Sequence, residues 1–406
     1  MATEIRPIGE DELDSAHLLL AYSFTGDRSQ GGRMKHVEAL GKAFALYDDG
    51  RMAACLRIFP LRMFIHGASV PLGGVSGVAS LPEHRRKGHV GRLLRHALAA
   101  MREEGQPLSS LFTPHPSLYR RYGWMIASGA LLHTFNPKDI APANPARPEG
   151  NAYRITAEQW PTVAKLYRQY AAPRNGYLER DEHWWKECVF HRIYDPKHRS
   201  NDVAVWADAR GEPRGYLVYH GASEQPPVGP SIDKLAIMEF VALDRTAYLG
   251  LLRYLLSHDL ADEISLWGSL DGPFIAALDE PNRAKQEHHY GFMLRIVDLE
   301  KAIAARPPAV GAPEGAFTIH ITDPSAPWNQ GAWRIECSDG RLAAVRADGT
   351  ADLSADAASF AAMYNGYLRA TEAARAGLIE IGNPQAAALA DRILATDYLP
   401  YPSEVF

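Results

Sequence analysis

The residues best suited to chemistry lie in one stretch, residues 75–94, which reads VSGVASLPEHRRKGHVGRLL. A basic turn at 85–88 follows an apolar stretch and directly precedes the apolar spacing of a helix. Backbone N–H groups at a helix N-terminus are unpaired and carry partial positive charge, so they attract anions. Gly88 lets an anion approach the backbone, and Arg85 and Arg86 supply fork-shaped donors suited to phosphate. The stretch therefore predicts a site for a phosphate-containing ligand rather than a solvated basic turn.

Familiar phosphate and nucleophile motifs do not describe this stretch. The chain has neither GxxxxGK[ST] nor GxGxxG, so it is neither a Walker P-loop nor a dinucleotide fingerprint. Residues 74–77 (GVSG) do not form a nucleophile elbow, because Val78 stands where GxSxG requires glycine.

Histidines supply alternative bases. His84, His89 and His115 could each accept a proton, and His89 is expected at the helix start beside the phosphates. Residues 288–289 (HH) lack a third ligand at a recognisable spacing, so we expect no metal.

The surrounding pattern shows which elements position the basic turn. A helical pattern covers 11–23, and alternating stretches predict antiparallel strands at 43–49, 52–67 and 73–81. Asp48-Asp49-Gly50 predicts a hairpin turn, since glycine accepts positive φ. After the basic turn the period becomes helical, and a short strand is expected at 108–112. One apolar stripe marks that helix: Val90, Leu93, Leu94, Ala97, Leu98 and Met101.

Two Pro-rich stretches, 136–150 and 305–316, divide the chain into segments of about 1–140, 150–304 and 315–406. Residues 241–254 repeat the strand, turn and helix pattern of 78–96 without its basic turn. The second segment therefore reads as a degenerate duplicate of the first. The third segment has three predicted strands followed by two helices.

Composition narrows the class of protein. The 406 residues carry a net charge of −5, so no global basic field argues for a nucleic-acid partner. Three cysteines cannot form a disulfide framework. No apolar run approaches the ~18 residues of a membrane span. The acidic, polar N-terminus does not resemble a secretory signal. We therefore expect a cytoplasmic protein without a membrane partner.

The basic turn resembles the pyrophosphate-binding motif of the GCN5-related N-acetyltransferases (GNAT), commonly Arg/Gln-x-x-Gly-x-Gly/Ala. Arg85 and Gly88 match this motif, whereas Val90 departs from it and Gly91 comes one residue late. That departure recurs in the Eis (enhanced intracellular survival) family. Four further segments resemble that family: SFTGD at 23–27, LYRRYG at 118–123, the closing strand of a second acetyltransferase-like domain at 291–299, and a sterol-carrier-protein-like domain at 315–406.

The resemblance implies an α+β fold and a binding site for acetyl-coenzyme A. It implies two tandem GNAT-like domains, each a mixed sheet flanked by helices, and a C-terminal sterol-carrier-protein-like α/β domain. Acetyl-coenzyme A would bind only the first domain, where a splayed strand lets the Val78 N–H meet the thioester carbonyl. The implied cofactor-binding residues are Val78, Ala79, Ser80, Arg85, Arg86, Lys87, Gly88, His89, Val90 and Gly91.

The resemblance also implies the catalytic groups. Tyr119 would protonate the leaving sulfur, and a tyrosine with an ordinary pKa of about 10 is protonated at neutral pH. The base would be the terminal carboxylate of Phe406. Phe24 matches a pocket residue of the family, while Asp27 and Glu404 could receive a cationic amine.

The expected function is N-acetyl transfer to primary amines, such as aminoglycoside-like polyamines, by direct attack in a ternary complex. Two alternatives stay open. One is a protein or peptide lysine acetyltransferase, and the other is a non-catalytic carrier of lipid or small ligands with a vestigial acetyltransferase domain. The family also implies a hexamer.

Overall fold

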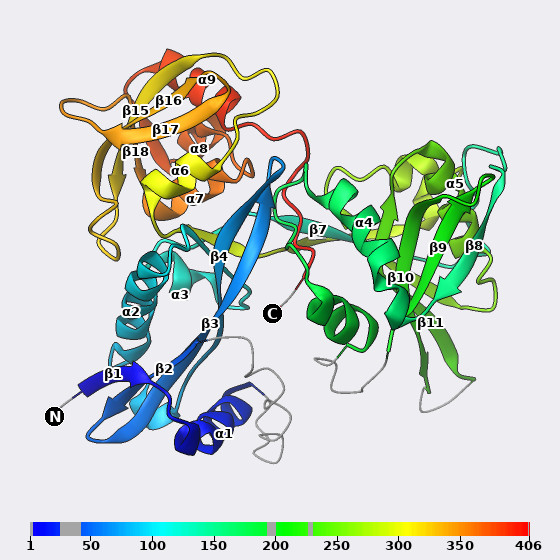
Figure 1. Ribbon diagram of the computed structural model, residues 1–406, viewed down its shortest axis with the longest axis horizontal. Helices are drawn as coiled ribbons and strands as arrows, with labels where there is room; N and C mark the ends of the chain where they lie inside the picture. Colours follow the sequence, from blue (N-terminus) through cyan, green and yellow to red (C-terminus); the bar gives the residue numbers. More distant parts are fainter. Residues whose placement is uncertain (1–2, 25–41, 193–199, 226–229, 405) are drawn as a thin grey trace. The chain divides into compact units, whose positions relative to one another are not determined.

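The computed structural model describes residues 3–24, 42–192, 200–225, 230–404 and 406 (Figure 1). These residues form two compact units. One comprises Met1–Ser128, Arg174–Leu178 and Gly291–Phe406, and the other comprises Gly129–Pro173 and Glu179–Tyr290. Both units combine sheets with helices, which confirms the predicted α+β class.

The first sheet of the first unit has seven strands in the order β1-β2-β3-β4-β5-β14-β6. The strands are β1 Thr3–Pro7, β2 Lys42–Asp48, β3 Arg51–Ile65, β4 Ala68–Ser80, β5 Leu108–Leu111, β14 Met293–Ile296 and β6 Met125–Ile126. β4 and β5 pair in parallel, whereas the other neighbours are antiparallel. The parallel pair needs a crossover connection, which the helix α2, His89–Glu103, supplies.

Local sequence explains the elements around this pair. The predicted hairpin turn joins β2 to β3, and Asp49 and Gly50 have φ of 49° and 77°. The apolar stripe of α2 is buried in the core under the sheet, where Leu93, Leu94 and Leu98 have no exposed surface. Two further helices belong to this domain, α1 Leu13–Phe24 and α3 Pro116–Arg120.

Strand β14 has neighbours that the sequence pattern does not predict. Residues 291–299 resemble the closing strand of the second acetyltransferase-like domain, and in the structure β14 lies between β5 and β6 in the first sheet. Conversely, β7, Gly129–Phe135, follows β6 in the chain and belongs to the sheet of the second unit. Periodicity identifies a strand but not its neighbours, so the sequence pattern could not reveal this exchange.

The second unit is built on the order β13-β7-β12-β11-β10-β9-β8. Its other strands are β8 Gly150–Ile155, β9 Asp202–Asp208, β10 Pro213–Glu224, β11 Ile232–Ala242, β12 Glu263–Ser269 and β13 Lys285–Tyr290. Its helices are α4 Trp160–Ala171, a π-helix Trp184–Phe190 and α5 Arg245–Leu256. β11, α5 and the parallel β12 repeat the arrangement of β4, α2 and β5, as the local sequence likeness predicts.

The C-terminal part of the first unit contains a five-stranded sheet in the order β17-β16-β15-β18-β19. The strands are β15 Gly315–Thr322, β16 Gly331–Ser338, β17 Arg341–Arg346, β18 Leu353–Asp356 and β19 Ile379–Ile381. The helices are α6 Leu299–Ala305, α7 Ala357–Tyr364, α8 Ala370–Arg375 and α9 Pro384–Ile393.

A buried ion pair fixes β14 within the first unit. The Arg295 guanidinium, with no exposed surface, donates two hydrogen bonds of 2.7 and 2.6 Å to the Asp323 carboxylate. A Cβ on Gly123 would lie 2.7 Å from Arg295 Nε, so only glycine leaves room for this side chain. Among the described residues, no helix is both long and apolar enough to cross a membrane.

Candidate functional site

The parallel strands β4 and β5 separate before β4 ends. Their pairing stops at Gly74 and Ser110, whereas β4 continues to Ser80. β4 also bulges against β3, because the register shifts where Gly77 and Val78 lie opposite a single residue. Gly77 has a φ of 60°, which suits a bulge residue. Beyond Gly74 the backbone of β4 is therefore free of the β5 ladder and can meet a ligand, the geometry expected around Val78.

The basic turn follows directly. It begins with a short 3-10 turn, Pro82–His84, and ends at Gly88, which adopts the left-handed conformation with φ 80° and starts α2 without a side-chain cap. A Cβ on Gly88 would meet no atom within 4 Å, so the surroundings of this backbone are open. Arg86 also has a positive φ, 62°, and Arg85 Nε donates to the Ser80 carbonyl at 3.2 Å.

The second unit differs at the N-terminus of α5, which corresponds to the N-terminus of α2. There the N-cap Asp244 accepts a hydrogen bond of 2.9 Å from the backbone N–H of Ala247, and Arg214 pairs with the same carboxylate. The N-terminus of α5 thus already carries an anionic cap, whereas the N-terminus of α2 does not. This contrast supports a phosphate site in the first unit only.

Side-chain packing explains why one residue of the motif, Gly91, is a glycine. A Cβ on Gly91 would lie 2.1 Å from the Tyr122 hydroxyl, so Gly91 allows Tyr122 to pack on α2. Val90 is half-buried against the core under the sheet. Neighbouring His89 is buried, while residues 85–88 are exposed.

Tyr119 lies on α3 in the core under the sheet, where 7% of its surface is exposed. Burial raises the pKa of its phenol to about 12, and a hydrogen bond with Thr113 acts in the opposite direction. Its ring packs edge-on against Trp124 with 6.4 Å between ring centroids. Tyr119 is therefore a protonated donor throughout the ordinary pH range.

Phe406 is docked at the separated part of β4. Its ring packs edge-on against Phe59 and Phe112, with centroid distances of 6.3 and 5.7 Å. A Cβ on Gly74 would lie 2.6 Å from the Phe406 ring, so Gly74 makes room for it. The Ser76 hydroxyl donates to the main-chain oxygen of Phe406 at 3.3 Å. Sequence patterns do not predict this contact of Ser76, because only the folded chain brings residues 76 and 406 together.

The residues expected to bind the acceptor amine are brought together less clearly than the other predicted site residues. Phe24 ends α1 with 62% of its side chain exposed. Asp27 lies outside the described residues. Glu404 is half-buried and accepts a hydrogen bond from Ser403.

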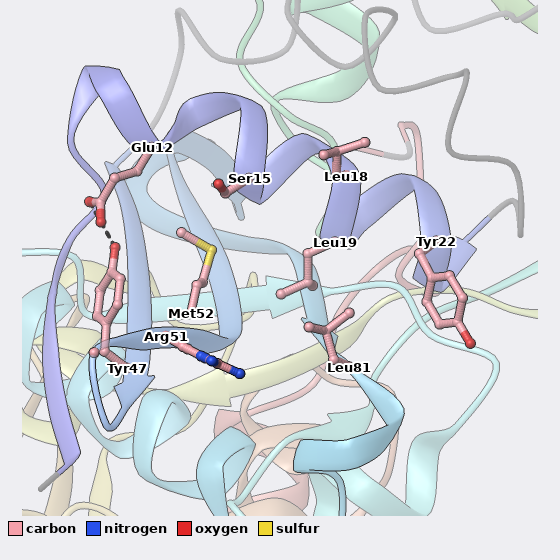
Figure 2. Close-up of a pocket in the computed structure, with 10 residues that line it drawn as sticks. Glu12, Ser15, Leu18, Leu19, Tyr22, Tyr47, Arg51, Met52 and Leu81 are labelled. Atoms are coloured by element: carbon pink, nitrogen blue, oxygen red, sulfur yellow. Dashed lines mark hydrogen bonds between the residues drawn. The ribbon is translucent and has the colours of Figure 1, made fainter.

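A pocket of about 430 Å³ lies beside α1, and Figure 2 shows its lining. The lining comprises Glu12, Ser15, Leu18, Leu19, Tyr22, Tyr47, Gly50, Arg51, Met52 and Leu81. Its carboxylate, Glu12, pairs with Arg6 at 2.6 Å and accepts from the Tyr47 hydroxyl at 2.8 Å. The hydrogen bond from Arg6 lowers the pKa of Glu12 to about 2. Glu12 is thus already engaged, and the described lining includes neither Tyr119 nor Phe406, so this pocket does not serve the predicted chemistry.

Comparisons with known proteins agree with this geometry. Models of the acetyltransferase (GNAT) domain match residues 4–127 and 176–296, and a sterol carrier protein domain model matches 299–403. An "Uncharacterized N-acetyltransferase" of Streptomyces avermitilis is 23% identical over 412 residues, which cover 99% of each chain. The N-acetyltransferase Eis of Mycobacterium bovis is 24% identical over 347 residues, or 83% of this chain and 81% of that protein. The crystal structure of Eis1 from Mycobacterium abscessus has the same fold, with a TM-score of 0.83, 24% sequence identity and full coverage of both chains.

Proposed function

Since the chain is an acetyltransferase of the GNAT superfamily with the domain architecture of Eis, we propose that it transfers acetyl from acetyl-coenzyme A to primary amines. GNAT acetyltransferases use acetyl-coenzyme A. The observation that carries the proposal is the uncapped N-terminus of α2, which lies directly after a strand that has separated from its parallel neighbour.

In this proposal the cofactor follows β4 and the basic turn. Its diphosphate accepts hydrogen bonds from backbone N–H groups at the start of α2 and pairs with Arg85 and Arg86. Its pantetheine arm extends along Ala79 and Ser80. The Val78 N–H donates to the thioester carbonyl and stabilises the oxyanion that forms there.

The transfer is direct and needs three events. The acceptor ammonium loses a proton to the Phe406 carboxylate, and the neutral nitrogen attacks the thioester carbon. The C–S bond then breaks as the C–N bond is retained. The nitrogen gives up its second proton, which ends on the sulfur, while Tyr119 donates a hydrogen bond to the departing sulfur or passes that proton on to it. The docked ring of Phe406 and the hydrogen bond from Ser76 support a fixed position for the carboxylate.

For the acceptor we propose an aminoglycoside-like polyamine, on the strength of the resemblance to Eis. A lysine side chain of a peptide is the alternative within the same chemistry. We also propose that the protein is cytoplasmic and assembles as a hexamer; light scattering of the purified protein tests the hexamer directly.

A different class of function has one observation in its favour. The C-terminal domain holds a pocket of about 290 Å³ whose lining includes Met363, Leu368, Leu394 and Leu399. Such a pocket could hold an apolar ligand. A carrier function would require ligand binding there without any binding of coenzyme A.

The test is release of coenzyme A thiol from acetyl-coenzyme A with polyamines, aminoglycosides and lysine peptides, alongside calorimetry of cofactor binding. We expect acceptor-dependent release. Exchange of Arg85 and Arg86 for Gln should weaken cofactor binding, whereas Arg210→Gln, on an exposed turn of the second unit, should not. Absence of both cofactor binding and release would overturn the proposal and favour the carrier.

The carboxylate has its own test. One glycine added after Phe406 moves the terminal carboxylate by about 3.5 Å. We expect lower turnover with unchanged cofactor affinity. Full activity of the extended enzyme would remove this carboxylate from the mechanism.

A further inference from the structure

Three side chains that the transfer chemistry does not use converge beside the phosphate loop. Asp48 ends β2, His84 ends the 3-10 turn before the loop, and His89 begins α2. Asp48 and His89 are 8% and 6% exposed, and His84 is half-buried. The sequence analysis assigned Asp48 only to a turn and treated both histidines as alternative bases, with His89 also among the implied cofactor-binding residues.

The spacing of their ligand atoms matches a metal better than a hydrogen-bond network. Asp48 Oδ2 lies 3.5 Å from His84 Nδ1 and 3.6 Å from His89 Nε2. All three ligand atoms lie within 4.8 Å of one another. Around a tetrahedral Zn²⁺ with bonds of about 2.1 Å, neighbouring ligand atoms are about 3.4 Å apart. The two distances from Asp48 are within a few tenths of an ångström of this value, and a rotation of the histidine side chains toward each other would complete three corners of a tetrahedron.

The hydrogen bonding of the cluster points the same way. Within the described part of the chain, His84 Nδ1 and both ring nitrogens of His89 are buried without a hydrogen-bond partner. Buried polar atoms in native proteins normally have a partner, so each such atom requires an explanation. A bound cation would satisfy a nitrogen of each ring at once.

Lys87 offers the competing explanation. Its ammonium lies 3.8 Å from Asp48 Oδ2, so it can balance the carboxylate charge. It makes no hydrogen bond to the buried nitrogens of either described histidine, and its side chain is half exposed. Lys87 can therefore turn to solvent if a metal takes its place.

We propose that Asp48, His84 and His89 bind a divalent transition-metal cation, with Zn²⁺ the best match. Two imidazoles and one carboxylate suit Zn²⁺, and the His84-x₄-His89 spacing falls within the range seen at zinc sites. The fourth position is left for water or an anionic oxygen. The phosphate loop, residues 85–88, lies between the two histidine ligands, so the metal ties this loop to the end of β2. This proposal replaces the expectation from sequence that the chain holds no metal.

The test measures metal uptake by the full chain. Protein stripped with a chelator is dialysed against Zn²⁺ and analysed by mass spectrometry, and Co²⁺ is added separately to detect the visible absorption of a four-coordinate site. We expect about one Zn²⁺ per chain and a raised melting temperature on loading. Asp48→Asn and His89→Gln should reduce uptake at least tenfold.

Asp49→Asn is the matched control. It removes a carboxylate from the same turn, and asparagine tolerates the left-handed φ of 49° found there. It should keep full uptake. Absence of uptake by the unaltered protein, or uptake that survives both Asp48→Asn and His89→Gln, overturns the proposal. Metal uptake needs neither acetyl-coenzyme A nor an acceptor, so its failure is distinguishable from failure of the transferase.

Discussion

Tyr119→Phe is the sharpest test of the proposed transfer. The substitution removes only the hydroxyl of a phenol that is 7% exposed, so the ring keeps its contacts with Trp124 and the core. Loss of one hydrogen bond costs about 1 kcal/mol of stability. The protein should therefore remain folded and bind acetyl-coenzyme A with nearly unchanged affinity.

The raised pKa of Tyr119 sets the size of the effect on turnover. A thiol has an ordinary pKa of about 8.5, so complete proton transfer from a phenol with a pKa of about 12 to a thiolate is uphill by about 5 kcal/mol. In this environment Tyr119 is better suited to donate a hydrogen bond to the sulfur than to lose its proton. Removing one such donor from a preorganised site lowers kcat by about 100-fold.

The assay is thiol release at saturating acetyl-coenzyme A between pH 6 and 10, for the unaltered enzyme, Tyr119→Phe and the control Tyr153→Phe. Tyr153 lies on β8 and is exposed, so its loss should change nothing. Because the Tyr119 phenol stays protonated over this range, it should produce no alkaline limb in kcat. Unchanged turnover in Tyr119→Phe would refute its role. An alkaline limb near pH 9 that disappears in Tyr119→Phe would refute the raised pKa.

Three further changes test other parts of the structure. Gly74→Ala should displace the terminal aromatic ring and lower kcat at least tenfold in the thiol-release assay, whereas Gly221→Ala, where a Cβ meets no atom within 4 Å, should not. Arg295→Met removes the cationic partner of the buried Asp323, which keeps only neutral donors, and should lower the free energy of unfolding by about 3–5 kcal/mol in urea. Arg334→Met breaks an exposed pair and should cost less than about 1 kcal/mol; equal losses would contradict the buried role. Burial lowers the pKa of His66 in the folded state to about 4, whereas a histidine in the unfolded chain has a pKa of about 6.5. As the pH falls below about 6.5, the unfolded state therefore binds a proton before the folded state does. Stability should therefore fall from pH 6.5 to pH 4, by less in His66→Asn, and an identical pH dependence would contradict the assignment.

Much of the fold could be predicted because it depends on local patterns. The α2 helix follows from the spacing of Leu93, Leu94 and Leu98, and the β2–β3 hairpin follows from Asp49 and Gly50. The likeness between residues 78–96 and 241–254 predicted the repeated strand and helix arrangement, which the second unit has. These features are set by neighbours in the chain, so a sequence pattern suffices to predict them.

The place of β14 could not be predicted in the same way. The pattern of Met293–Ile296 identifies a strand, but the choice of β5 and β6 as neighbours depends on long-range packing. The buried contact of Arg295 with Asp323 is part of that packing, and no spacing of residues in the sequence predicts it.

Local sequence was enough to predict a basic turn that opens a helix after a strand, and from it a phosphate site in the first domain. The surroundings of that predicted site depend on the tertiary structure. It brings Phe406 to Ser76 across 330 residues, separates β4 from β5 beyond Gly74, and gathers Asp48 with His84 and His89. The physical reason is that local patterns report the conformation of neighbouring residues, whereas distances between remote side chains arise when the sheet and its helices pack together.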